Sequence, residues 1–542
     1  MFLKVMISAV MLSLCWQNLT QAAPPEVTSL FPAGTERGAS VKVTIQGKLG
    51  EGANEVWTSR RGVQVQFGDK AGPLTVSVAP DVEPGICWMR FFNSEGSTSL
   101  RPFIIGAFRE VIEQEPNDDV VAGQPLPSLP VVMNGQHGKN GDTDSFAVSL
   151  RKGQVVVASL MANRTLGSPQ DAVLQILGPD GFVLEQNEDD QGFDPFLVYT
   201  AAADGIYTLR TWAFPATPDS SIRLYGNPAC VYRLLVTTGP YIDHVMPQSV
   251  QAGQSERLHL FGWNLTQTQQ EVQSPVSALG RTYRWPVDGW INHIPVTVLA
   301  QPWKSIVETE PNPLAEPQSV ELPMTVSGAI NHSRDVDAYQ FQASKGSRWK
   351  IELIARDAGS PLDPVVRVYD SAGKLLKEAD DDGKQSPDPD FEFTAPADDR
   401  YRVTVTDRFL HFGERFTYLL SIVEPTADFS LSVSTDSFVL QPDKELEIPV
   451  TVNRSGMTDV IQIEAHGLPD GVTASAVTSE PKGDSAKSVK LKLKSNDQTK
   501  FSGPVRIVGR PLNSVMNERT ATVSLKAFQS DLPYLWLTVK PK

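Results

Sequence analysis

Short runs of alternating apolar and polar residues recur along the whole chain. In residues 41–45 every second side chain is apolar, as in a β-strand with one buried face. Such runs are separated by turn sequences, among them Pro-Asp-Gly, Ser-Ala-Gly and Ala-Asp-Gly. Beyond the first 22 residues, no stretch carries a convincing amphipathic helical period. The pattern therefore predicts an all-β protein.

Two segments repeat one another without a gap. PEVTSLFPAGTERGASVKVTIQG (residues 25–47) aligns with PYIDHVMPQSVQAGQSERLHLFG (residues 240–262), so that prolines, glycines and alternating apolar positions coincide. We interpret the shared glycines, which include Gly47 and Gly262, as turn residues. The pattern resembles the IPT/TIG family of immunoglobulin-like β-sandwich domains. The resemblance implies two such sandwiches, at residues 23–108 and 239–305.

A longer repeat begins with Glu-x-Glu-Pro-Asn, at residues 113–117 and again at 308–312. Downstream, DTDSFAVSL matches DVDAYQFQA, DAVLQILGPDG matches DPVVRVYDSAG, and TAAADGIYTLRT matches TAPADDRYRVTV, in the same order. The whole repeat resembles the bacterial pre-peptidase C-terminal (PPC) domain, a jelly-roll-like β-sandwich. The resemblance implies PPC-like sandwiches at residues 109–238 and 306–424.

The last 118 residues or so, 425–542, contain further alternating or β-branched runs, such as ELEIPVTVNRSG and SVKLKLKSN, between turn residues. We interpret this segment as a C-terminal immunoglobulin-like sandwich. The expected architecture is a string of about five β-sandwiches behind a signal peptide, held as a rigid rod.

The Glu-x-Glu-Pro-Asn segment gathers oxygen-bearing side chains. Two glutamates at positions i and i+2 of an extended chain point the same way, and two aspartates with this spacing precede the next strand. In the first copy the set is Glu113, Glu115, Asn117, Asp118, Asp142 and Asp144. If the fold brings these side chains together, they offer about the number of oxygen donors that Ca²⁺ takes. Without a cation they would repel one another.

The PPC resemblance implies the same chemistry, because PPC-like domains of secreted collagenases bind calcium through a linker and first-strand set of this kind. It implies one Ca²⁺ in each copy. The second copy retains Glu308, Glu310, Asn312, Asp335 and Asp337. Pro313 stands where Asp118 does, so we expect the second site to be weaker. The alternative is a solvated linker with aspartates that only form turns.

Two further sets of residues leave alternatives open. The acidic loops at 188–190 and 380–382 either hold another cation or form hairpin turns in water, and we favour turns. Four aromatic residues after corresponding strands form either a ligand platform or packing contacts, and we favour packing. These residues are Trp212, Phe214, Phe409 and Phe412.

The first residues indicate export. Lys4 precedes an apolar run at residues 5–16, and small residues lead up to a predicted cleavage after Ala22, so residues 1–22 are expected to be a signal peptide. No later apolar run approaches the ~20 residues of a membrane helix. We therefore expect a secreted or periplasmic protein without a membrane span. For Cys87 and Cys230, separate buried thiols are favoured over a disulfide.

Composition and missing motifs narrow the function. A net charge of −15 argues against nucleic acid as a partner and is compatible with binding cations. No HExxH, Gly-x-Ser-x-Gly, P-loop or dinucleotide-binding motif occurs, so we expect no enzyme activity. The favoured interpretation is an exported, calcium-stabilised binding or adhesion-type protein that presents β-sandwich surfaces to an extracellular protein or polysaccharide. One alternative is a peptidase-associated secreted hydrolase, or a non-catalytic subunit of such an enzyme. Another is a structural component of the cell envelope.

Overall fold

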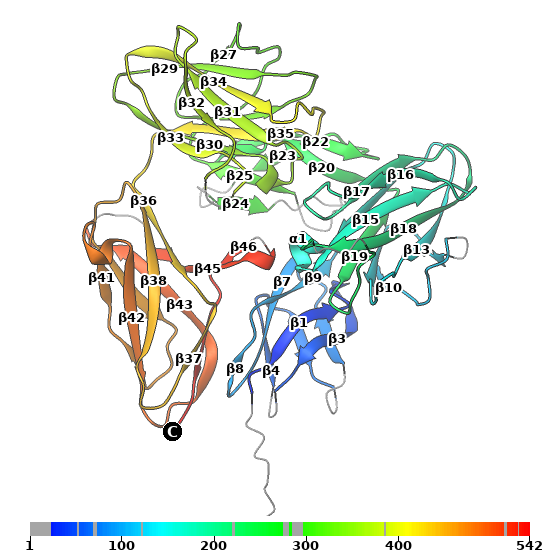
Figure 1. Ribbon diagram of the computed structural model, residues 1–542, viewed down its shortest axis with the longest axis horizontal. Helices are drawn as coiled ribbons and strands as arrows, with labels where there is room; N and C mark the ends of the chain where they lie inside the picture. The colour runs from blue at the N-terminus through cyan, green and yellow to red at the C-terminus, as the bar shows by residue number, and fades with distance from the viewer. Residues whose placement is uncertain are drawn as a thin grey trace, which may run out of the picture.

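The structure is a computed structural model that describes residues 23–50, 54–68, 73–120, 123–218, 223–274, 281–284, 296–383, 386–513, 518–528 and 530–542. Its regular structure is almost entirely β, which confirms the expected all-β class. In these residues the strands form ten sheets, which pack in pairs around apolar cores (Figure 1). We call the five pairs sandwiches A to E in chain order. The predicted signal peptide, residues 1–22, lies outside the described residues.

Sandwiches A and C contain the first repeat. The strands of A are β1 (Glu26–Phe31), β2 (Gly34–Glu36), β3 (Ser40–Lys48), β4 (Glu55–Thr58), β5 (Val63–Gln66), β6 (Leu74–Val78), β7 (Gly85–Asn93), β8 (Gly96–Ser97) and β9 (Arg101–Gly106). The strands of C are β20 (Tyr241–Met246), β21 (Ser249–Gln251), β22 (Ser255–Trp263), β23 (Gln269–Gln273), β24 (Arg281–Arg284) and β25 (Thr297–Gln301). In A, the sheet β1-β3-β6-β5 faces the sheet β2-β9-β7-β4, and in C the sheet β20-β22-β23 faces β21-β25-β24.

The shared glycines near the end of this repeat lie inside strands. Gly47 in β3 and Gly262 in β22 sit opposite register shifts in β1 and β20. A Cβ atom at Gly47 would lie 2.0 Å from the carbonyl oxygen of Glu26, and one at Gly262 would lie 2.1 Å from that of Tyr241. The interpretation of these two glycines as turn residues was therefore wrong, because they permit a close approach of two backbones at a bulge.

Sandwiches B and D contain the second repeat. The strands of B are β10 (Glu110–Ile112), β11 (Gln124–Pro125), β12 (Val131–Gln136), β13 (Asp144–Leu150), β14 (Val155–Met161), β15 (Gln170–Leu177), β16 (Val183–Asn187), β17 (Phe196–Thr200), β18 (Gly205–Pro215) and β19 (Val231–Thr237), with the short helix α1 (Asn163–Leu166). The strands of D are β26 (Ser305–Val307), β27 (Gln318–Ser319), β28 (Met324–Ala329), β29 (Asp337–Ala343), β30 (Arg348–Ile354), β31 (Pro364–Tyr369), β32 (Leu375–Ala379), β33 (Asp390–Thr394), β34 (Asp399–Asp407) and β35 (Thr417–Val423), with the 3₁₀ turn η3 (Arg356–Ala358).

The two copies share one strand order. The sheets β10-β12-β19-β14-β17 and β11-β13-β18-β15-β16 of B correspond to β26-β28-β35-β30-β33 and β27-β29-β34-β31-β32 of D. Details repeat as well, because the hydroxyls of Tyr207 and Tyr401 donate to the carbonyl oxygens four residues earlier, at 2.9 and 2.8 Å. We call the segment that enters each copy, with its strand β10 in B or β26 in D, the lead-in. In both copies the lead-in strand is an edge strand parallel to the next strand of its sheet.

Sandwich E completes the fold. Its strands are β36 (Asp428–Val433), β37 (Ser437–Leu440), β38 (Leu446–Ser455), β39 (Ile461–His466), β40 (Val472–Ala474), β41 (Val477–Ser479), β42 (Ser488–Ser495), β43 (Phe501–Pro511), β44 (Arg519–Thr520), β45 (Thr522–Leu525), β46 (Ser530–Leu532) and β47 (Leu535–Val539), with the 3₁₀ turns η4 (Asp484–Ala486) and η5 (Lys526–Phe528). The sheet β40-β42-β38-β36-β45-β46 faces the sheet β37-β47-β43-β39-β41. Apolar side chains from both sheets form the core of the sandwich between them.

The first and last sandwiches pack against each other. Arg90 in β7 of A forms an ion pair with Asp436, just before β37 of E, with 2.8 Å between Nη2 and Oδ2. The two side chains are 1% and 5% exposed. Figure 1 shows the blue strands of A beside the orange strands of E. Because B also packs on A and on C, and C on D, the five sandwiches close into a ring, and the expected rigid rod was wrong.

Aromatic side chains fill the contact between A and E. The rings of Phe92 and Trp536 have centroids 4.6 Å apart, and those of Trp88 and Phe528 lie 5.3 Å apart. At the rim, Nζ of Lys540 lies 2.5 Å from Oε2 of Glu95. The contact thus has a buried apolar and ionic centre and a partly exposed rim.

The two cysteines outside the first 22 residues are separate. Cys87 and Cys230 are both buried as free thiols, and burial raises the pKa of each to about 11. This confirms that they act as small apolar side chains. Across the described ranges, no helix has the length and apolar character needed to cross a membrane.

Candidate metal centres

The acidic residues of sandwich B meet where the lead-in strand ends. Strand β10 runs parallel to β12, and the backbone N–H of Glu113, one residue past β10, donates to the carbonyl oxygen of Asn134 at 3.0 Å. Asp144 is the first residue of β13 in the opposite sheet. Carboxylate oxygens of Glu113, Glu115 and Asp144 all lie within 4.8 Å of one another. The lead-in and the first strand are thus brought together, as the sequence predicts.

A buried tyrosine lies between these carboxylates. The hydroxyl oxygen of Tyr232, in β19, lies 2.6 Å from Oδ2 of Asp144 and 3.1 Å from Oε2 of Glu113. The other oxygen of Glu113 accepts the backbone N–H of Gln136 at 2.6 Å. The two carboxylates are therefore held at fixed positions by donors from β12 and β19.

Several polar atoms of the cluster have no hydrogen-bond partner. They belong to buried side chains: both amide atoms of Asn117, Oδ1 of Asp142 and Oδ1 of Asp144. Nζ of Lys139 lies 3.6 Å from Oδ1 of Asp142. Buried polar atoms normally have partners, so the oxygens of Asn117 and Asp144 that lack one are candidate ligands for a bound ion. Asp118 lies beside them and accepts the backbone N–H of Thr143 at 3.3 Å.

Burial makes full ionisation of this cluster unfavourable. Desolvation, followed by repulsion from Asp144, raises the pKa of Glu113 to about 10. Desolvation also raises the pKa of Asp144 well above its ordinary value. The pKa of Glu115 is raised by desolvation and then by the negative charge of Asp142. A cation at this point would remove the repulsion and hold the carboxylates ionised.

Sandwich D repeats the arrangement. Carboxylate oxygens of Glu308, Glu310 and Asp337 lie within 4.8 Å of one another. The hydroxyl of Tyr418 lies 2.6 Å from Oδ2 of Asp337 and 3.2 Å from Oε2 of Glu308. Both amide atoms of the buried Asn312, and Oδ1 of Asp337, have no hydrogen-bond partner. Four of the five predicted residues of the second copy therefore gather here.

The fifth predicted residue, Asp335, belongs to a neighbouring group. Ligand atoms of Glu310, His332 and Asp335 lie within 4.8 Å of one another, and Nδ1 of His332 is 2.9 Å from Oδ2 of Asp335. Glu310 is common to both groups. His332 is not among the predicted ligands, because its spacing to Asp335 matches no metal-binding motif.

Three other residues of the centre in B were also missed. His137 is fully buried, with Nδ1 2.8 Å from Oε1 of Gln170 and Nε2 3.5 Å from Oδ2 of Asp144, and burial lowers its pKa. A Cβ atom at Gly135 would lie 2.1 Å from Cζ of Tyr232, so only glycine fits beside that ring. Tyr232 and Gly135 recur as Tyr418 and Gly328, and comparing the two copies position by position would have found them.

We expect the metal-free protein to lose stability as the pH rises. Desolvation raises the pKa of Glu308 from 4.5 to about 7, so the folded state retains a proton that the unfolded state releases. That stabilisation is complete below about pH 4.5 and is lost as the pH rises through about 7, at about 1.4 kcal/mol per pH unit for each retained proton. Urea unfolding in a chelator at pH 5 to 8 would show the fall, and calcium would flatten it. Stability that rises over this range in chelator would contradict the expectation.

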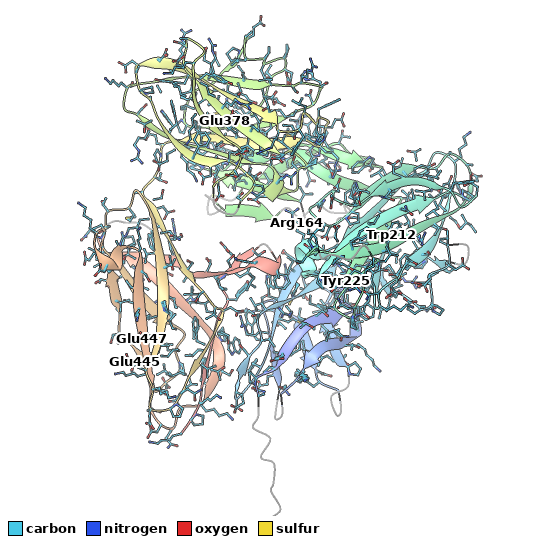
Figure 2. All side chains as sticks on the ribbon, viewed as in Figure 1. Arg164, Trp212, Tyr225, Glu378, Glu445 and Glu447 are labelled. Atoms are coloured by element: carbon cyan, nitrogen blue, oxygen red, sulfur yellow. The ribbon has the colours of Figure 1, made fainter. Side chains whose placement is uncertain are left out.

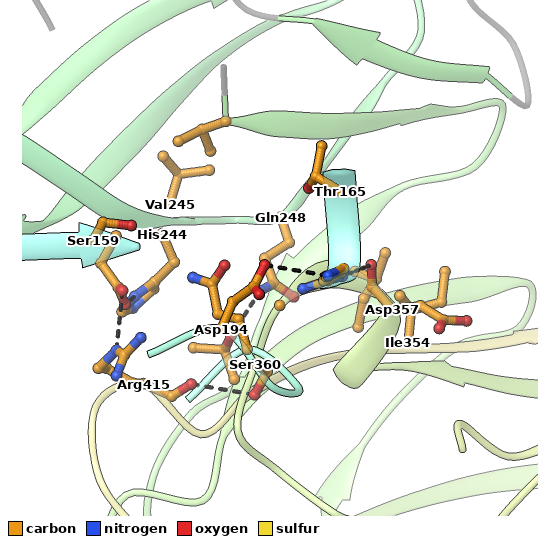
Figure 3. A pocket seen from close by; sticks show the side chains of 18 of the residues that line it. Ser159, Thr165, Asp194, His244, Val245, Gln248, Ile354, Asp357, Ser360 and Arg415 are labelled. Carbon is orange, nitrogen blue, oxygen red and sulfur yellow. Dashed lines mark hydrogen bonds and ion pairs between the residues drawn. The ribbon is translucent and has the colours of Figure 1, made fainter. Parts of the chain in front are cut away.

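A separate cavity of about 550 Å³ lies where B, C and D meet (Figure 3). The guanidinium of Arg415 binds both oxygens of Asp190 at 2.7 and 2.8 Å, and its Nε donates to Oδ1 of Asp243 at 2.9 Å. Across the same junction, Arg164 of α1, near the centre of Figure 2, donates to the carbonyl oxygen of Asp357 at 3.3 Å. None of the predicted metal-binding residues lines this cavity.

The acidic loops have different roles. Asp190 of the first loop is paired with Arg415, so this residue is neither a metal ligand nor a solvated turn residue but part of the B–D contact. In the second loop, Asp380 pairs with Arg408, and Oδ1 of Asp381 accepts the backbone N–H of Gly383 at 2.7 Å, as in a hairpin turn.

The four aromatic residues singled out from the sequence differ in their exposure. Trp212, labelled in Figure 2, and Phe214 are half-buried, and the guanidinium carbon of Arg210 lies 5.3 Å from the centroid of the Trp212 ring. Phe409 and Phe412 are 60% and 50% exposed. The favoured packing role was therefore wrong for Phe409 and Phe412.

The comparisons with known proteins identify one family. Residues 335–407 match the model of the bacterial pre-peptidase C-terminal domain, so sandwich D contains a PPC domain. No curated protein matches the sequence of this chain.

The solved structures that match this chain have low sequence identity and low TM-scores. The pre-peptidase C-terminal domain of a Bacillus anthracis collagenase is 15% identical, covering 21% of this chain and 99% of that chain, with a TM-score of 0.16. A Salmonella alpha-2-macroglobulin reacted with methylamine is 10% identical over 96% of this chain and 47% of that chain, with a TM-score of 0.14. The Bacteroides ovatus protein SGBP-B of a mixed-linkage glucan utilization locus, in complex with a heptasaccharide, is 8% identical over 70% and 74%, with a TM-score of 0.14.

Proposed function

We propose that this chain is an exported, calcium-stabilised binding protein without a catalytic domain, which presents β-sandwich surfaces to an extracellular protein or polysaccharide. The observation that carries the proposal is the pair of acidic clusters in which several buried oxygen atoms lack hydrogen-bond partners, around Asp144 in B and Asp337 in D. A PPC domain is a binding or accessory fold, in keeping with this function.

Calcium suits these clusters because it takes six to eight oxygen ligands in flexible geometry. In B the oxygens would come from Glu113, Glu115, Asn117, Asp118, Asp142 and Asp144, and in D from Glu308, Glu310, Asn312, Asp335 and Asp337. The ion would fasten each lead-in segment to its sandwich. Since the lead-ins follow A and C directly, calcium would set the angles at two joints of the ring.

The extracellular protein or polysaccharide would contact side chains that remain exposed on the ring of sandwiches. The loop after β34 exposes Phe409, Leu410 and Phe412, each by half or more of its surface. Exposed apolar groups clustered on one loop are typical of a binding surface. Calcium in D would hold the sandwich that carries this loop at a fixed angle to sandwich C.

Calcium titration of the full-length chain, freed of metal with a chelator, tests the proposal. We expect binding heat and a thermal shift with dissociation constants of about 10⁻⁴–10⁻³ M, tighter in B than in D. The variant Lys139→Gln should bind calcium more tightly in B, because the Lys139 ammonium lies beside Asp142, Asp118 and Glu115, which raise its pKa.

The control is Lys152→Gln, which removes the same charge from an exposed position elsewhere in B. It should leave the calcium affinity unchanged. Absence of both binding heat and thermal shift at millimolar calcium would overturn the proposal.

A further inference from the structure

The two acidic clusters differ at two positions on their outer side. Residues 135–144 of B align without a gap with residues 328–337 of D, and Lys139 corresponds to His332. Asp118 of B corresponds to Pro313 of D. On this outer side, the second copy lacks the carboxylate and the ammonium group of the first and carries an imidazole, while the buried His137 of B corresponds to Ile330 in D.

In B the outer side of the cluster already contains a cation. Nζ of Lys139 lies 3.6 Å from Oδ1 of Asp142, and the pKa of Lys139 is raised first by Asp142 and then by Asp118. A permanent positive charge at this place compensates the outer carboxylates and excludes a second metal ion from them.

In D the same place holds an imidazole, a side chain that can bind a metal ion. Nδ1 of His332 is 2.9 Å from Oδ2 of the buried Asp335, and a ligand atom of each lies within 4.8 Å of a carboxylate oxygen of Glu310. The imidazole is 60% exposed, so an ion can reach it from solvent. Beside this group, the buried Asn312 has both amide atoms unpartnered, although its backbone N–H donates to Oε2 of Glu310 at 3.1 Å.

We propose that Glu310, His332 and Asp335 form a second metal site in D, with a preference for a borderline divalent ion of the Zn²⁺ class over Ca²⁺. Calcium binds oxygen ligands, whereas an imidazole combined with carboxylates suits zinc and similar ions. Three protein ligands leave one position of a tetrahedral zinc ion for water. The inference rests on the proposed cation-binding role of these clusters but assigns a different ion and a ligand outside the calcium set.

The site can be tested on the full-length, chelator-treated protein with millimolar calcium present throughout. Zn²⁺ is titrated in competition with a chromogenic chelator, and Co²⁺ is added as an absorbing substitute that reports on its ligands. We expect one equivalent of tightly bound Zn²⁺ and visible Co²⁺ bands. His332→Lys, which installs the residue of the first copy, should weaken Zn²⁺ binding about tenfold or more and remove the bands.

Two further variants sharpen the test. Lys139→His should create a second Zn²⁺ site, in B, and raise the stoichiometry from one to two. His411→Gln is the matched control, because His411 is an equally exposed histidine of D that lies 3.8 Å from a carboxylate of Asp407 but belongs to no group of three ligands in the described residues. It should leave Zn²⁺ binding unchanged.

The possible outcomes separate this inference from the proposed function. Unchanged Zn²⁺ affinity in His332→Lys, or equal losses in His332→Lys and His411→Gln, would overturn the zinc site whatever calcium does. If His332→Lys loses Zn²⁺ binding and His411→Gln does not, the zinc site is supported. This holds even if the unchanged protein binds no calcium, because absence of calcium binding would overturn only the calcium proposal.

Discussion

Replacing Asp436 with alanine is expected to open the ring. The carboxylate is the partner of the Arg90 guanidinium inside the contact between A and E, where both side chains are almost fully buried. Removing one member of a buried ion pair leaves an uncompensated charge and costs about 3–5 kcal/mol. Sandwich E follows D through the connection between β35 and β36, so it should swing away from A about this connection. Small-angle X-ray scattering would record a larger radius of gyration.

The rim of the same contact provides the control. Glu95→Ala breaks the ion pair with Lys540, in which both side chains are about a quarter exposed, and should cost no more than about 1 kcal/mol. Its scattering curve should match that of the unchanged protein. The double variant Arg90→Met with Asp436→Leu should restore closure, because apolar replacement of a buried pair is often neutral. An unchanged radius of gyration for Asp436→Ala would show that the remaining contacts between A and E are sufficient to hold the ring.

The second large effect is expected from Gly135→Ala. The added methyl group would lie 2.1 Å from Cζ of Tyr232 and 2.6 Å from Oε2 of Glu113. The tyrosine ring is fully buried and cannot withdraw, so we expect a loss of about 3 kcal/mol, at the upper end of the usual cost of overpacking. Because Glu113 is displaced as well, calcium binding at the proposed site in sandwich B should be lost, together with the thermal shift expected from it.

Gly138→Ala is the matched control for this substitution. It lies three residues away in the same segment, and the nearest atom to its new methyl group would be Oδ2 of Asp142 at 3.7 Å, an ordinary contact. Thermal unfolding with and without calcium compares the two variants. Equal stability for both would mean that the Tyr232 ring can move and that the cluster is not rigidly held.

Local sequence patterns were sufficient to predict the fold class and the repeats. Alternation identified the strands, and the two PPC-like copies fold with one strand order because their apolar positions and turn residues coincide. Gly47 shows where this reasoning failed, because a glycine needed for backbone contact inside a sheet has the same sequence appearance as a turn glycine.

The acidic side chains of the candidate sites were predictable because spacing i, i+2 on an extended chain fixes their direction. The role of Tyr232 was not predictable. It contacts Asp144 from a strand 88 residues further along the chain, and the residues next to it in sequence are those of an ordinary buried strand. The same holds for Asp190 and Arg415, which are 225 residues apart. Contacts of this kind depend on how sandwiches pack, and a pattern within one strand carries no information about them.

The contact between sandwiches A and E has a consequence for the order in which the protein matures. Asp436 is synthesised 346 residues after Arg90, so the first sandwich emerges from the ribosome with Trp88, Phe92 and the Arg90 guanidinium still facing water. That face is covered only when the last sandwich arrives. Sandwich A is therefore made before E but reaches its final surroundings only together with it, and its exposed apolar surface favours aggregation of the nascent chain until E has folded against A.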